Sequence, residues 1–319
     1  MVTAPPIVQA NKLTLLGLIN QATGELGLPQ YTQIVNNTDS QAVQLLALAK
    51  REGKEFFNMA NRIGGWEELR KQYIFQTSAI TGLTGNTTVG SAVVTNISST
   101  AGIVAGRWAV SGTTLAYGTR VLSVDSSTQI TMDSVAVETG TAVDLSFGQD
   151  AYTIPSDFAY FIQQTYWDRN FRWQLLGPLS AQEWQVIKSG ISPTGPRRRF
   201  RVMGGYFWID PTPTDSTSNE VFEYYSNSWC QSSTGTAQST WAADGDYYTL
   251  DDDAFILGLK WRILAAKKLD YGQEKQDYDM LCQRLVSRNG GNRDIPINAQ
   301  ASGMHLINNA NIPDTGFGS

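Results

Sequence analysis

Carboxylates are the first residues in this chain whose types could do chemistry. Asp251, Asp252 and Asp253 follow one another, but successive side chains on a helix point about 100° apart and do not converge on one metal ion. Acidic side chains at a helix N-terminus complement the positive end of the helix dipole. We therefore expect these aspartates to begin a helix and not to form a metal site.

The sequence does not contain the arrangements of residues that common hydrolases need. Asp144, Asp150 and Glu183 would have to flank a sugar as an acid and base pair to cleave a glycoside, and their spacing in the sequence does not favour such a pair. The single histidine, His305, lies near the C-terminus, and there is no Gly-x-Ser-x-Gly or phosphate-cradling motif. We expect no catalytic residue, no cofactor and no metal.

The one basic cluster is the run Arg197, Arg198 and Arg199, followed by Arg201. In a strand, alternation sends Arg197, Arg199 and Arg201 to one face and Arg198 with Phe200 to the other. Arginine pairs well with carboxylates across an interface. A subunit interface through Arg197, Arg199 and Arg201 and a merely solvated or ion-paired strand face are two equal interpretations, and contact with DNA phosphates is a third.

The composition bounds the class of protein. The chain has 319 residues, of which 41% are hydrophobic and 17% charged, which is typical of a folded protein of one large or two ordinary domains. Its net charge of -5 argues against a grip on DNA phosphates. Cys230 and Cys282 are expected to be ordinary core residues. No stretch of about 18 apolar residues and no secretory signal is present, so we expect the protein to stay in the cytoplasm where it is made.

Four segments have the apolar spacing of helices, and Asp39 is the expected cap of the second. They are Lys12 to Ala22, the segment from Asp39 to Gly64-Gly65, the segment that begins at Asp251, and Gln273 to Ser287. The last two are expected to form an antiparallel pair.

The composition changes between Ser78 and Gln149, where Arg107 and Arg120 are the only basic residues. Short β-rich runs separated by turn residues are typical of a small sandwich or barrel. The runs are 92–96, 107–110, 120–124, 129–132 and 142–147. Tyr73–Thr77 and Ala151–Pro155 flank this segment as two strands that would form a hairpin. We interpret residues 78–149 as a β module inserted at the tip of that hairpin.

Large aromatic residues gather between Tyr166 and Phe200, which must be buried or meet a partner. Before them, 162–168 has the composition of a strand. Within the stretch, Ser180 and Glu183 have the spacing of a capping box, and Gly190 is expected to end the helix that they begin. After it, Gly204-Gly205 between two strand-like runs predicts a tight hairpin.

Several motifs recur together in a known family. They are WDRNFRWQLLGPLSAQEW from Trp167, GPRRRFRV from Gly195, FWIDPTP from Phe207, VFEY from Val221, and the helical LKWR and LDY from Leu259 and Leu269. This arrangement resembles the head-to-tail adaptor, or connector, proteins of short-tailed bacteriophages, the group that includes tail tubular protein A. The resemblance covers most of Phe56 to Gly291, with the β module as one large interruption.

The resemblance implies a structural protein of the virion that is present in the host cytoplasm during assembly. It implies a homo-oligomeric ring of twelve subunits between the portal protein and the tail or nozzle proteins. Genomic DNA would pass through the ring without sequence-specific binding. The alternative is a carbohydrate-binding, or less favoured glycan-cleaving, virion protein that acts through the β module, with Trp108, Tyr117 and Phe147 as its aromatic platform.

The residues after Asn292 have no helical or strand period, yet they carry apolar side chains. We expect an extended arm that orders against the portal or an adjacent subunit. Its interface candidates are Ile295, Ile297, Leu306, Ile312 and Phe317. The expected fold class is therefore α+β: a discontinuous core domain, 1–77 and 150–291, of helices and small antiparallel sheets, an inserted sandwich-like module, 78–149, and a C-terminal arm, 292–319.

Overall fold

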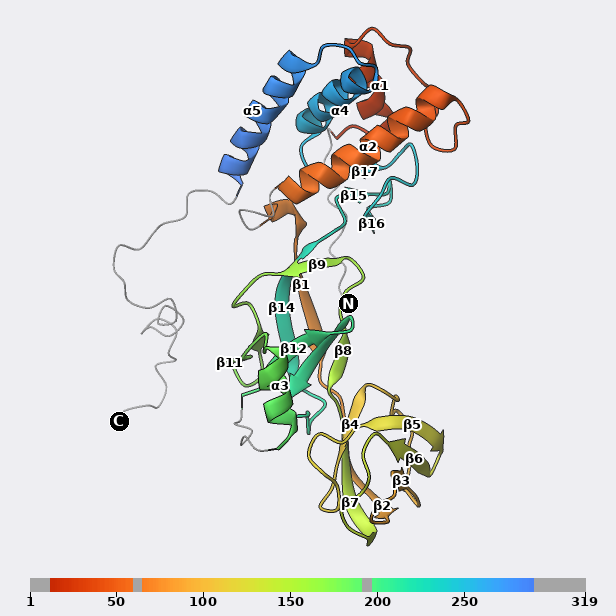
Figure 1. Cartoon of the computed structure of the whole chain (residues 1–319), viewed down its shortest axis with the longest axis vertical. Helices are drawn as coiled ribbons and strands as arrows, with labels where there is room; N and C mark the ends of the chain where they lie inside the picture. Colours follow the sequence, from red (N-terminus) through yellow and green to blue (C-terminus); the bar gives the residue numbers. More distant parts are fainter. Residues whose placement is uncertain (1–11, 60–64, 191–196, 290–319) are drawn as a thin grey trace, which may run out of the picture.

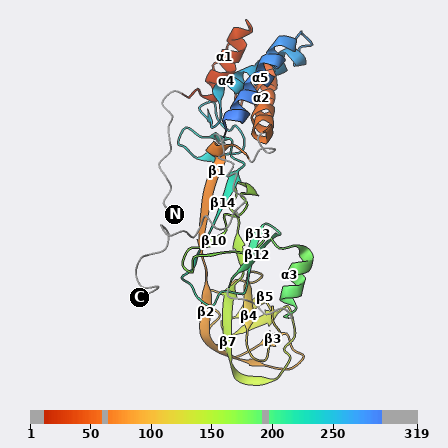
Figure 2. The ribbon, with the colours of Figure 1, turned by 90° about the vertical axis from the view of Figure 1, so that its left-hand side faces the viewer.

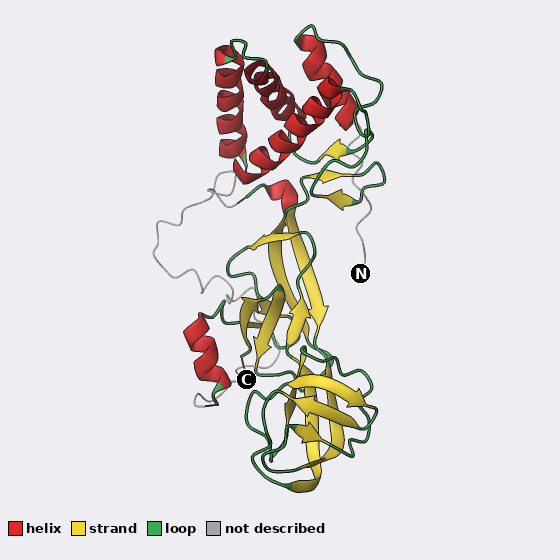
Figure 3. Ribbon diagram, turned by 45° about the vertical axis from the view of Figure 1, so that its right-hand side comes forward, coloured by secondary structure: helices red, strands yellow, loops and turns green. Residues whose placement is uncertain are grey.

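The fold is mixed α+β, with most of the helices at one end of an elongated chain and most of the strands, with one short helix beside them, along the rest (Figure 1). The computed structural model describes residues 12–59, 65–190 and 197–289. Figure 3 shows several small sheets in succession rather than one continuous sheet. No helix among these residues is long and apolar enough to cross a membrane.

Four helices and a small sheet share one core at the first end of the molecule. They are α1 (Leu15–Glu25), α2 (Ser40–Met59), α4 (Asp252–Ala266), α5 (Gly272–Arg288), and strands β15 (Cys230–Gln231), β16 (Ala237–Gln238) and β17 (Tyr247–Tyr248). The predicted caps are confirmed: Asp39 accepts from the backbone N–H groups of Gln41 and Ala42, and Asp251 accepts from that of Ala254.

Both free cysteines are buried, as expected. Gly53 lies on α2 where a Cβ would meet the ring of Trp229 at 2.4 Å, so packing requires a glycine there.

Two antiparallel sheets form the middle of the molecule. One contains β1 (Arg70–Gln76), β14 (Asn219–Ser226), β10 (Trp167–Asp168), β11 (Trp173–Gln174) and β9 (Phe158–Phe161); the other contains β12 (Arg199–Met203), β13 (Tyr206–Asp210) and β8 (Ala151–Thr153). Their facing aromatic side chains, with Phe200, Phe207 and Phe222 almost fully buried, make the core between them. The long strands β1 and β14 run side by side toward the helices (Figure 2).

Residues 79–149 form two three-stranded sheets around a core of their own. The sheets are β2 (Ala79–Thr87), β7 (Gly140–Gln149) and β4 (Trp108–Ser111), and β3 (Val93–Val94), β6 (Gln129–Met132) and β5 (Val121–Ser126). All five predicted strand runs are confirmed. Strand β2 was not predicted, because its glycines and threonines are not typical of a strand. Pairing with β7 stabilises the extended conformation of β2, which its own residues do not favour.

The expected hairpin between 73–77 and 151–155 is wrong. Strand β1 pairs with β14, and β8 pairs with β13, so the two segments belong to different sheets. They meet face to face: the ring centroids of Phe75 and Tyr152 lie 4.4 Å apart. The chain ends of the module nevertheless remain adjacent, because the backbone N–H of Gln149 donates to the carbonyl of Ser78 at 2.8 Å.

A further expectation changes in the structure. The strand expected over 162–168 is reduced to β10, because Gln164 adopts a left-handed conformation with φ 65° that interrupts an extended chain. Residues 231–246, which are mostly polar, contribute β16 and bury Trp241 against Trp229. The capping box of Ser180 and Glu183 on helix α3 (Ala181–Lys188) and the Gly204-Gly205 hairpin are confirmed.

Candidate functional site

The side chains of strand β12 alternate between two faces, with Arg199 and Arg201 half-buried on one of them. Arg199 lies opposite Asp210 and Arg201 opposite Trp208 in the hairpin, while Phe200 between them is fully buried. Among the described residues, no carboxylate lies within ion-pairing distance of Arg197, Arg199 or Arg201. Their side chains therefore keep their hydrogen-bonding capacity for something outside the described chain.

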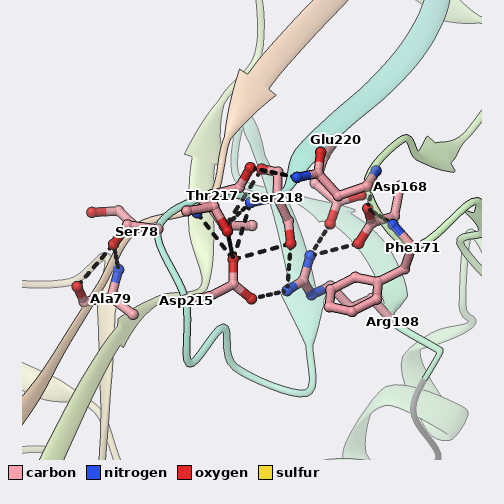
Figure 4. Close-up of polar contacts among 12 residues, drawn as sticks. Ser78, Ala79, Asp168, Phe171, Arg198, Asp215, Thr217, Ser218 and Glu220 are labelled. Atoms are coloured by element: carbon pink, nitrogen blue, oxygen red, sulfur yellow. Dashed lines mark hydrogen bonds and ion pairs between the residues drawn. The ribbon is translucent and has the colours of Figure 1, made fainter.

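Arg198 points the other way, into a cluster of three carboxylates (Figure 4). Its Nη1 lies 3.0 Å from Asp168 Oδ2 and also contacts Glu220 Oε1, and its Nη2 lies 3.2 Å from Asp215 Oδ2. The cluster ties β10, β14 and the 211–218 loop to the start of β12. The strand alternation predicted that Arg198 shares a face with Phe200, but it could not identify the role of Arg198, because the three partners are far from it in the chain.

Burial and hydrogen bonding act differently on the carboxyls of this cluster. Burial raises the pKa of Glu220 to about 7, although Arg198 opposes the shift. Its second oxygen, Oε2, is buried and has no hydrogen-bond partner. Burial also acts to raise the pKa of Asp215, but the backbone N–H groups of Thr217 and Ser218 outweigh it and lower that pKa to about 2. Glu220 is thus the carboxyl that changes charge near neutral pH.

We expect the stability of the protein to rise on acidification from pH 7 toward pH 4.5. The folded state holds a proton on Glu220 up to about pH 7, whereas the unfolded chain releases it near 4.5. Folding therefore binds a proton in this window, and the free energy of unfolding falls as pH rises, by on the order of 3 kcal/mol for the full shift. Urea unfolding at several pH values measures this dependence.

Glu220→Gln should remove that part of the pH dependence, because glutamine mimics the protonated acid. Glu223→Gln, on the same strand but partly exposed, is the matched control and should leave the slope unchanged. A Glu220→Gln variant whose pH profile parallels the wild type would contradict the assignment.

A second charged cluster joins the β module to the middle sheets. Asp150 is fully buried and accepts two hydrogen bonds from Arg120. Arg120 Nη2 donates to Oδ1 at 3.0 Å, and Arg120 Nε donates to Oδ2 at 3.2 Å. The Arg120 guanidinium also lies 4.1 Å from the ring centroid of Trp208. Burial raises the pKa of Asp150, and Arg120 and Lys188 oppose that shift. A bidentate, stacked arginine fixes orientation as well as distance.

Other side chains complete this junction. Lys188 Nζ lies 2.8 Å from Asp210 Oδ1, and the Tyr117 hydroxyl donates to the same carboxylate at 3.0 Å. Arg107 donates to the Tyr206 hydroxyl at 3.1 Å. Both basic residues of the module are therefore used to hold it against the rest of the chain. Asp150, one of the carboxylates considered for glycoside cleavage, is a structural ion-pair partner here.

A hollow of about 300 Å³ adjoins the Arg198 cluster, between the β10–β11 hairpin and the loop after β13. Phe171 stacks on Trp173 at its edge, with ring centroids 5.5 Å apart, and remains half exposed. The charged groups at its floor, Asp168, Asp215 and Arg198, already bind one another. The hollow can receive an apolar or aromatic side chain but offers no free nucleophile or base.

The aromatic platform expected for a glycan is wrong in two of its three members. Trp108 is 3% exposed and Phe147 is 1% exposed, because both fill the core of the β module. Only Tyr117 reaches the surface, and its hydroxyl binds Asp210. A sugar-binding site in the module would need stacked surface aromatics, so this alternative loses its main support.

The apolar candidates of the C-terminal arm lie outside the described residues. These are Ile295, Ile297, Leu306, Ile312 and Phe317. Among the described residues, no group of three or more His, Cys, Asp or Glu side chains is arranged to hold a metal ion.

A family model described as SU10 adaptor protein matches residues 105–294. This range is more than half of the chain and includes most of the β module, every strand of the middle sheets except β1, and helices α4 and α5. No curated protein matches the chain.

Proposed function

We propose, from the premise that the chain belongs to the SU10 adaptor protein family, that it forms a ring between the portal and the tail of a phage particle. The family makes the protein a phage adaptor and a component of the virion. The ring, its twelve subunits, the channel for DNA and the docking of portal and tail or nozzle proteins are parts of the proposal.

The observation that best supports a ring is the absence of an ion-pair partner for Arg199 and Arg201 of β12 among the described residues. Arg199 and Arg201 have no carboxylate partner among the described residues, although most other buried or half-buried basic side chains do. A heterologous contact between two different faces of one subunit generates a closed ring when the rotation closes. An arginine face that meets a carboxylate face of the next subunit satisfies this requirement.

The charge of the chain supports passage of DNA without binding. With a net charge of -5, the surface as a whole repels a duplex, and like charge around a channel keeps DNA from adhering. We also propose that the protein is not an enzyme, since the carboxylates of its buried clusters are engaged by cations. The division into a core domain, a module over 78–149 and an arm over 292–319 belongs to the same proposal.

Arg199→Glu is expected to weaken ring formation, because it places a carboxylate where the neighbouring subunit would present one. Native mass measurement of purified protein across a concentration series should show the variant as monomers at concentrations where the wild type forms rings. The loss should be at least about tenfold in apparent affinity, which corresponds to 1.4 kcal/mol.

Lys50→Glu is the matched control for this experiment, since Lys50 is an exposed cation on α2. It changes the net charge equally and should leave the ring intact. Rings of unchanged mass and stability in Arg199→Glu would contradict the role of β12, and a wild type that stays monomeric at all concentrations would contradict the ring.

A further inference from the structure

One end of the β module lies far from its junction with the middle sheets. Its long strands β2 and β7 pair from Ala79 and Gly148, next to the middle sheets, to Thr87 and Gly140 at the other end. Nine residues of extended strand span roughly 30 Å. The end at Thr87 and Gly140 is therefore the part of the module that is farthest from its attachment, and Figure 1 shows it at the end of the molecule opposite the helices.

Two short segments lie side by side at this free end. Val89 bridges to Ala136, the backbone N–H of Gly90 donates to the Ala136 carbonyl at 2.9 Å, and that of Ala136 donates to Ser91 at 2.9 Å. Ala136 is 1% exposed and packs into the module, while its neighbours Val135 and Val137 are turned outward. Val89, Val135 and Val137 are 60%, 52% and 53% exposed. We call these three valines the tip patch.

The tip patch belongs to a surface with one sign of charge. The charged residues of the module are two arginines and four carboxylates. Arg107 and Arg120 are both used at the junction, whereas Asp125, Asp133, Glu138 and Asp144 are all exposed. Glu138 directly follows the tip patch in sequence. The exposed surface of the module thus carries carboxylates without a compensating cation among the described residues, and one of them, Glu138, adjoins the apolar tip patch.

Such a surface selects its partner by charge. DNA and anionic membranes are repelled by carboxylates, and an uncharged apolar surface would gain nothing from Glu138 and the other carboxylates of the module. A protein surface with lysine or arginine side chains around an apolar centre matches both features. The junction of Arg120, Asp150 and Trp208 keeps the tip in a defined direction, which reduces the entropy lost on docking.

We propose that the tip patch is the docking surface for a partner protein, different from this chain, that presents lysine or arginine side chains around an apolar centre. This rests on the proposed function, because it names the surface through which the adaptor meets a neighbouring virion protein. It assigns the β module to attachment and leaves ring formation to the core domain.

Site-specific photocrosslinking in assembled particles tests the proposal. The full-length chain carries benzoylphenylalanine in place of Val137, and the crosslinked peptides are identified by mass spectrometry. The expected product joins Val137 to another virion protein at a segment that contains lysine or arginine. Val104, 49% exposed in the turn before Arg107, is the matched control position and should not give this product.

A charge variant separates docking from assembly. Glu138→Lys should lower the yield of the Val137 crosslink by up to about fivefold, with Glu138→Gln intermediate, while the mass of the purified ring and the melting temperature stay those of the wild type. Crosslinks to another copy of this chain, to an acidic segment, or to nothing in particles that contain the chain would overturn the proposal. A wild-type chain that is absent from particles would overturn the proposed function as well.

Discussion

Arg262→Leu is expected to lower the free energy of unfolding by about 3 to 5 kcal/mol, because it leaves a carboxylate buried without its cation. Glu52 on α2 is fully buried, and its Oε2 accepts from Arg262 Nε at 2.5 Å while its Oε1 accepts from the Tyr278 hydroxyl at 2.7 Å. The three residues come from α2, α4 and α5. Their contacts hold these helices together in the core.

The surrounding packing leaves the Glu52 carboxylate no room to move away. A Cβ on Gly258 would lie 2.1 Å from Glu52 Oε1, so the close approach of α2 and α4 depends on that glycine. Burial raises the pKa of Glu52 and Arg262 opposes the shift. Without Arg262 the side chain must either stay charged in the core or take up a proton, and both cost stability.

Chemical denaturation of Arg262→Leu and of Arg51→Leu makes the comparison. Arg51 forms an exposed pair with Glu55 at 2.7 Å on the same helix, and its loss should cost less than about 1 kcal/mol. The double variant Glu52→Leu with Arg262→Leu should recover much of the loss, since no charge is then buried. Equal effects of the two arginine substitutions would show that Glu52 does not depend on Arg262.

The second large effect is expected from Arg198→Met, which removes the cation that pairs with Asp168, Asp215 and Glu220. The free energy of unfolding should fall by about 3 to 5 kcal/mol at pH 8. The loss should be smaller at pH 5, because Glu220, with its pKa of about 7, is then protonated and one buried negative charge is gone.

Arg199→Met is the matched control, because Arg199 is the next residue and points to the opposite face of β12. Its substitution should lower the free energy of unfolding much less than that of Arg198, because Arg199 is only half-buried and no carboxylate of the described residues pairs with it. Thermal or urea unfolding of both variants at the two pH values provides the measurement. A loss for Arg198→Met that is as large at pH 5 as at pH 8 would contradict the role given to Glu220.

The features that were predicted correctly from sequence have local causes. The capping box of Ser180 and Glu183, the aspartate cap of α4 and the Gly204-Gly205 hairpin each depend on residues a few positions apart. The five strand runs of the module follow from the same local alternation of composition. The motifs shared with phage adaptor proteins also lie in continuous stretches, and the family match agrees with them.

What needed the tertiary structure involves partners that are distant in the chain. The sequence alone determined that 73–77 and 151–155 include strands and that Arg198 and Arg199 lie on opposite faces, because backbone propensity and alternation are local properties. Only the tertiary structure decided that these strands pair with β14 and β13 and that Arg198 pairs with Asp168 and Glu220. It also decided that Trp108 lies in the core of the β module and not on a surface platform for a sugar. Strand pairing and burial of charge depend on the free energy of many long-range contacts at once, which no local pattern specifies.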